Sequence, residues 1–81
     1  MINRPSDKDI GKRVRELRCA MHLTQDGFAD LVGISNAHSI ARIERGVRGV
    51  SRDLAVTIAV ACDISLDWLI LGRGADSKAV R

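Results

Sequence analysis

The chain has few aromatic residues and almost no proline, and these absences limit the possible fold classes. Its 81 residues include no tyrosine, one phenylalanine and one tryptophan, yet 46% are hydrophobic. The core must therefore consist mainly of Leu, Ile, Val and Ala side chains. The chain has a single proline and few segments in which β-branched residues alternate with polar ones, and its apolar residues recur at helical spacing. These features predict an all-α fold. A chain of this length forms one domain in which burial is marginal, so dimerisation would add stability.

Cysteine and long apolar runs are also scarce. Two cysteines do not make a disulfide scaffold. Cys19 and Cys62 fall beside apolar positions of predicted helices, which favours buried, reduced thiols over a disulfide or redox switch. The longest apolar run, 54–62, is interrupted by Thr57 and is too short to span a bilayer. No charged start followed by an apolar stretch indicates a signal peptide. We expect a cytoplasmic, nucleoid-associated protein that has no membrane partner.

The basic residues are unevenly distributed, although the net charge is only +3. The segments 19–41 and 53–71 contain no Lys or Arg. The bases concentrate between Arg4 and Arg18 and in four arginines within eleven positions, Arg42, Arg45, Arg48 and Arg52. This clustering favours phosphate contacts for the group, whereas any one of these arginines alone could equally be a solvated loop residue.

The segment 24–46 predicts two short helices joined by a tight turn. Thr24 can cap the first helix, and Gly33 can adopt the left-handed conformation that ends it. Ser35 or Asn36 can cap the second helix, which Gly46 ends in the same way. Each helix has one apolar face, and the small side chain of Ala29 falls where the helices would cross closely. This arrangement is typical of a helix-turn-helix, whose second helix enters the DNA major groove.

Three further helices are predicted. The first covers about 7–21, with Ser6 as its cap and a buried stripe of Ile10, Val14, Leu17 and Met21. The fourth begins after Ser51 and packs on the helix-turn-helix through Leu54, Ala55, Ile58, Ala61 and Cys62. The fifth, capped by Ser65, runs over 66–71 and ends at Gly72. The chain thus divides into an arm (1–5), a compact five-helix domain (6–72) and a flexible tail (73–81).

Several short motifs occur in the order of a known family: LTQ at 23–25, FA at 28–29, GIS at 33–35, IERG at 43–46 and SLDWL at 65–69, with IGKRVR and LR in the first helix. From about Ile10 to Gly72 the chain resembles the lambda-repressor-like (XRE or Cro type) DNA-binding domains. It departs from their pattern by one extra residue between Ser35 and Ile40, in the turn or at the start of the helix. It also has Gly27 where a helix former is usual, which costs about 1 kcal/mol or lets another backbone approach closely.

Candidate DNA contacts follow from position and chemistry. In the second helix of the helix-turn-helix, the side chains that can reach base edges are Asn36, Ala37, His38, Ser39 and Arg42. Asn36 can instead cap the helix, and His38 can equally be an exposed surface residue. The candidate phosphate contacts are Thr24, Gln25, Arg45, Arg48 and Arg52. The resemblance implies the phosphate role of Gln25.

The resemblance also implies two structural roles. Glu44 would pair with Arg18 and tie the first helix to the recognition helix. The segment Trp68, Leu69, Ile70 and Leu71 would form a dimer contact. Its apolar residues surround the helix more than one packing face requires, although Trp68 could equally complete a monomer core.

Three functions compete. The first is a prokaryotic or phage transcriptional regulator, a repressor that binds an inverted-repeat operator in double-stranded DNA as a homodimer and responds through its own concentration. The second is an antitoxin that neutralises a toxin partner and binds its own promoter. The third, an enzyme, would need converging catalytic groups, and two separated histidines and two separated cysteines provide none. We expect no catalytic residues, metal, cofactor or small-molecule ligand.

Overall fold

The computed structural model describes residues 6–73. The predicted arm, 1–5, and all but the first residue of the predicted tail lie outside these residues. The helical elements are α1 (Asp7–Ala20), α2 (Gln25–Val32), α3 (Ala37–Glu44), α4 (Arg52–Cys62) and a short π-helical turn, η1 (Asp67–Leu71). The predicted all-α class with five helices is therefore confirmed.

Each helical element begins where a local side chain can cap it. The side chains of Ser6, Thr24 and Ser51 each accept a hydrogen bond from the backbone N–H three residues later, as does Ser65 ahead of η1. These bonds satisfy donors that the first turn of a helix leaves without partners. At the end of α2, Gly33 adopts the left-handed conformation with a φ of 79°. Its lack of a Cβ makes that conformation inexpensive and lets the chain turn sharply towards α3.

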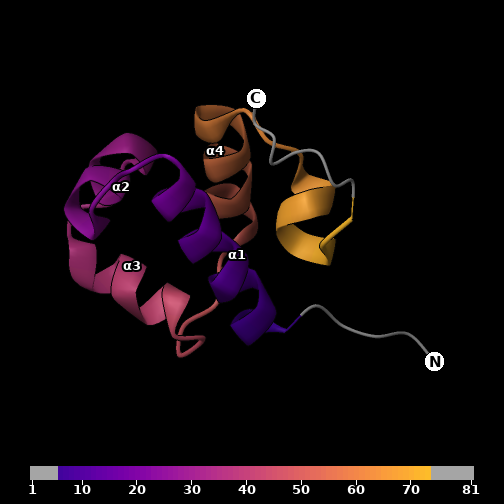
Figure 1. Ribbon diagram of the computed structural model, residues 1–81. Coiled ribbons are helices and arrows are strands. Elements are labelled where there is room, and N and C mark those ends of the chain that lie inside the picture. The colour runs from indigo at the N-terminus through magenta and orange to yellow at the C-terminus, as the bar shows by residue number, and fades with distance from the viewer. Residues whose placement is uncertain (1–5, 74–81) are drawn as a thin grey trace.

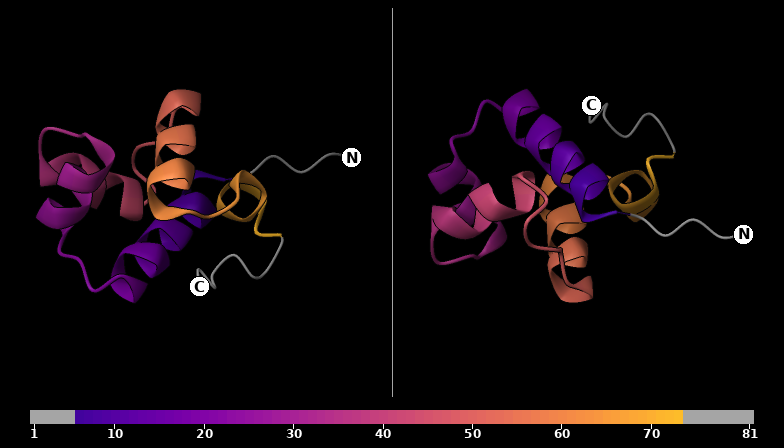
Figure 2. Two further views of the ribbon diagram at one scale, coloured as in Figure 1. Left: turned by 90° about the horizontal axis from the view of Figure 1, so that it is seen from above. Right: turned by 90° about the horizontal axis from the view of Figure 1, so that it is seen from below.

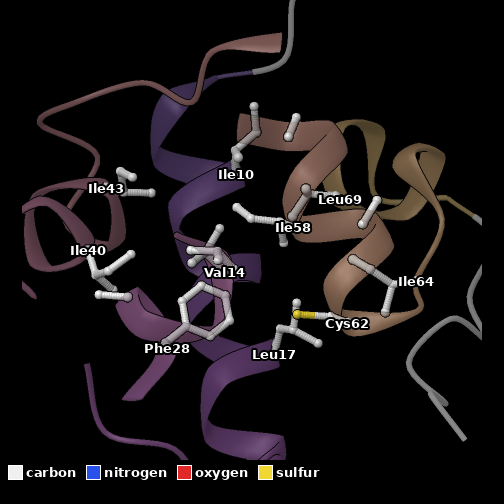
Figure 3. Close-up of a cluster of buried hydrophobic side chains, with 14 residues drawn as sticks. Ile10, Val14, Leu17, Phe28, Ile40, Ile43, Ile58, Cys62, Ile64 and Leu69 are labelled. Carbon is white, nitrogen blue, oxygen red and sulfur yellow. The ribbon is translucent and has the colours of Figure 1, made fainter. Parts of the chain in front are cut away.

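The helices enclose one aliphatic core. In Figures 1 and 2, α2 and α3 lie at one end of the molecule, η1 lies at the other, and α1 extends between them. Figure 3 shows Val14 of α1 beside the ring of Phe28 of α2, and both side chains are fully buried. The predicted stripe of α1 is buried at Ile10, Val14 and Leu17, whereas Met21 is only partly buried.

The predicted burial of one residue of α4, Ala61, is wrong. Ala61 is exposed, and Ala59 is buried in its place at 8% exposure. The buried positions 55, 58, 59 and 62 follow the i, i+3, i+4, i+7 spacing of a single helix face. Ala61 falls outside that face, so it points to solvent.

The two cysteines also differ from each other. Cys62 is buried, and burial raises its pKa to about 11, so the thiol stays protonated at neutral pH. Cys19 is exposed, which contradicts its predicted burial, because it lies outside the stripe by which α1 packs on the core. Among residues 6–73, no helix is long and apolar enough to cross a membrane.

A close approach between helices occurs at Gly11, which is buried in α1. A Cβ at this position would overlap the backbone carbonyl oxygen of Ile43 and lie 3.1 Å from that of Glu44. Only glycine therefore lets α1 approach the last turn of α3 so closely. At Gly27, by contrast, a Cβ would meet Leu23 and Thr24 side-chain atoms at 3.4 Å. The predicted alternative of a close backbone approach at Gly27 is therefore wrong.

Candidate nucleic-acid interface

The extra residue of the turn lies before α3, not within it. Asn36 is extended, with a φ of −151°, and its Oδ1 accepts a hydrogen bond from the N–H of Ser39 at 3.2 Å. Asn36 is thus the cap, and Ser35 remains in the turn. Ala37, His38 and Ser39 then fill the three places between the cap and Ile40.

The two sides of α3 have different surroundings. Ile40 and Ile43 are fully buried at 0% exposure and anchor the inner side. His38 and Arg42 are exposed, while Ala37 and Ser39 are half-buried. Four of the five candidate base contacts therefore lie along the helix itself, and the fifth, Asn36, is exposed at its start. The hydrogen bond from the Ser39 N–H engages the side-chain oxygen of Asn36, Oδ1, and leaves the side-chain NH₂ group available as a donor.

A polar network joins α1, α2 and α3 beside this surface. Arg18 Nε donates to Glu44 Oε2 at 2.6 Å, and Arg18 Nη2 donates to Oε1 at 3.1 Å. Such a two-point contact is stronger and more directional than a single hydrogen bond. The hydrogen bond with Glu44 raises the pKa of Arg18, against the opposing effect of burial. The side chains of Arg18 and Glu44 are only 14% and 6% exposed.

Gln25 belongs to the same network. Its Nε2 donates to Glu44 Oε1 at 3.2 Å, and Arg18 Nη1 donates to the carbonyl oxygen of Leu23 at 2.9 Å. Glu44 therefore orients a side chain at the start of α2 as well as one on α1. Gln25 retains one amide hydrogen for an external acceptor. The sequence resemblance implied the Arg18–Glu44 pair, but it gave no role to Glu44 in holding Gln25.

The remaining candidate phosphate contacts have different environments. Thr24 caps α2, since its Oγ1 accepts the N–H of Gly27 at 3.0 Å. Arg45, Arg48 and Arg52 are all exposed. Arg45 lines a surface hollow together with Gln25, whereas Arg48 lies in the following loop and Arg52 opens α4.

At the other end of the molecule, η1 contributes both to the core and to the surface. Leu69 is fully buried, so its predicted place in a dimer interface is wrong: the side chain has no surface to offer a partner. Trp68 and Ile70 are partly buried against the core, and Leu71 is 48% exposed. Arg13 of α1 donates to the carbonyl oxygens of Leu69 and Ile70, each at 2.8 Å, and so satisfies two acceptors at the helix end. No pattern in the sequence indicates this contact.

Known proteins share this architecture. Residues 14–69 match the helix-turn-helix family model. The chain is 36% identical in sequence to the restriction-modification controller protein C.AhdI from Aeromonas hydrophila, and its fold matches the crystal structure of that protein with a TM-score of 0.71. That similarity covers 78% of this chain and 94% of C.AhdI. A search of curated proteins found no match. The chain belongs to the lambda-repressor-like, XRE-type helix-turn-helix family, whose domains bind DNA and regulate transcription.

Proposed function

We propose that this chain is a cytoplasmic transcriptional repressor of a prokaryote or phage, which binds an inverted-repeat operator in double-stranded DNA as a homodimer. The observation that carries the proposal is the contrast between the sides of α3: Ile40 and Ile43 are fully buried, whereas His38 and Arg42 are exposed. A helix anchored on one side and open on the other can enter a major groove. The similarity to a restriction-modification controller protein supports the same functional class.

Each part of the surface has a distinct task in this proposal. Arg42 pairs with the O6 and N7 acceptors of a guanine, and Ala37 touches a thymine methyl. Asn36, His38 and Ser39 contact neighbouring base edges. The groups that hold the phosphates and fix the register of the helix in the groove are Thr24, Gln25, Arg45, Arg48 and Arg52.

Selection of bound duplexes from a random pool tests this function. We expect enrichment of an inverted repeat whose half-sites are centred about 34 Å apart, one turn of DNA, because a two-fold dimer presents two recognition helices. Failure to enrich any sequence at low ionic strength would refute specific DNA binding. A promoter carrying the selected site should lose expression when the protein is supplied, and increased expression would contradict repression.

A pair of surface variants tests the dimer. Leu71 of η1 is 48% exposed and Val60 of α4 is 75% exposed, so either can become lysine without entering the core. If η1 forms the interface through Trp68, Ile70 and Leu71, then Leu71→Lys should sediment as a monomer, because it places a charge in an apolar contact. Val60→Lys should remain dimeric. The reverse result would place the interface on α4.

A further inference from the structure

A basic hollow lies beside the exposed side of α3. It has a volume of about 320 Å³ and is formed by α1, the start of α2 and the second half of α3. Its lining residues are Arg15, Arg18, Gln25, Ala41, Glu44 and Arg45. Arg15 is not among the predicted base or phosphate contacts, yet the fold places it in the same hollow as Gln25 and Arg45.

The charges of this hollow favour an anion. Three arginines and one carboxylate line it, which leaves a net charge of +2. The carboxylate of Glu44 is only 6% exposed, and its two oxygens accept hydrogen bonds from Arg18 and Gln25. Its charge is therefore compensated within the protein. Arg15 and Arg45 are exposed, and within residues 6–73 neither guanidinium group makes a hydrogen bond or salt bridge.

The position of the hollow indicates which anion it receives. Ala41 and Arg45, which line it, each come three residues after an exposed residue of α3, His38 and Arg42 respectively. Residues three apart are neighbours on a helix surface, so the hollow adjoins the exposed side of α3. A DNA strand read by Arg42 must carry its sugar-phosphate backbone past this edge of the protein. We propose that the hollow holds a backbone phosphate and that Arg15 of α1 is a further phosphate contact. This inference rests on the proposed DNA-binding function and adds α1 to the DNA-contacting elements.

A matched pair of variants on α1 tests the proposal in the full chain. Arg15→Gln removes one positive charge from the hollow, whereas Lys12→Gln removes a positive charge that is also exposed but does not line it. Binding is measured at several salt concentrations on the selected duplex and on a random one. Arg15→Gln should weaken both to the same extent and reduce the slope of log K against log salt by about 0.9 for each bound protomer, hence by about 1.8 for a dimer, because each protomer loses one phosphate contact. Lys12→Gln should leave the slope unchanged.

Two results would overturn the proposal while leaving DNA binding intact: a parental slope in Arg15→Gln, or an equal reduction in Lys12→Gln, which would indicate a general charge effect. Saturable binding of inorganic phosphate at the hollow, followed by NMR at constant ionic strength, together with a parental slope in Arg15→Gln, would assign the hollow to a free anion instead. Failure of the parent chain to bind any duplex would overturn this inference and the proposed function together. Thermal unfolding of both variants should match the parent because both residues are exposed.

Discussion

The two sides of α3 differ in how strongly the rest of the chain constrains them. On the inner side, Ile40 and Ile43 are fully buried, Gly11 lies against the carbonyl oxygen of Ile43, and Glu44 is held by Arg18 and Gln25. On the outer side, His38 and Arg42 are exposed. In the proposed function, stability and recognition therefore belong to opposite sides of one eight-residue helix. Substitutions on the inner side should affect folding, and those on the outer side should affect DNA discrimination.

The largest effect is expected at Glu44. Glu44→Ala leaves the guanidinium of Arg18 largely buried without its partner, a change that costs about 3–5 kcal/mol of unfolding free energy for a buried ion pair. Urea unfolding measures this loss, and Glu16→Ala, which removes an exposed carboxylate of α1, serves as the control. A loss below about 1 kcal/mol would mean that the pair behaves like an exposed one.

Gly11→Ala should be the next most damaging substitution. The added methyl group would overlap a backbone oxygen that no rotamer change can move, so α1 and α3 must separate. Overpacking of this kind costs about 1–3 kcal/mol or more, and we expect the upper end because the obstacle is backbone. Thermal or urea unfolding of the variant measures the effect. Parental stability in Gly11→Ala would show that the two helices do not need this close approach.

Local contacts could be predicted from the sequence, whereas contacts between distant residues could not. The helix caps are readable because each joins a side chain to a backbone N–H only three residues away. Gly11 packs against α3, and Arg13 donates to carbonyl oxygens 56 and 57 residues later. No local pattern marks such partners. A glycine beside Ile10 in an amphipathic helix is a signal of close packing, but a close approach was predicted only for Gly27.

The candidate site also has parts that the sequence predicts and parts that it does not. The helix-turn-helix segment and its exposed arginines follow from spacing and charge, and the pairing of Arg18 with Glu44 followed only from the family resemblance. The hollow beside α3 could not be predicted, because it depends on how α1 crosses α3 and therefore on the packing at Gly11. Leu69 was misplaced at the surface because four consecutive apolar residues, 68–71, surround η1, and periodicity cannot identify the inner side of such a helix.

On the outer side of α3, Arg42→Ala should alter recognition without altering the fold. Loss of a paired guanine contact costs about 1–3 kcal/mol of discrimination between the operator and a random duplex for each half-site of the operator. The ratio of the two dissociation constants measures it, and the unfolding midpoint should match the parent because Arg42 is exposed. The matched comparison is Arg48→Ala, which should weaken both duplexes alike if Arg48 contacts phosphate. An unchanged ratio in Arg42→Ala would remove its role in base recognition.

The smallest expected effect is a gain of stability at Gly27. This residue lies in the first turn of α2, and an added Cβ would make ordinary contacts of 3.4 Å with Leu23 and Thr24 side-chain atoms. Alanine retains the N–H that Gly27 donates to Thr24, and it reduces the conformational entropy of the unfolded chain. Gly27→Ala should therefore stabilise the fold by about 0.5–1 kcal/mol. The opposite signs expected for alanine at Gly11 and Gly27 separate the effect of a crowded backbone from that of glycine itself. Destabilisation at Gly27 would show that α2 cannot accept even one methyl group there, and the contrast between the two glycines would be lost.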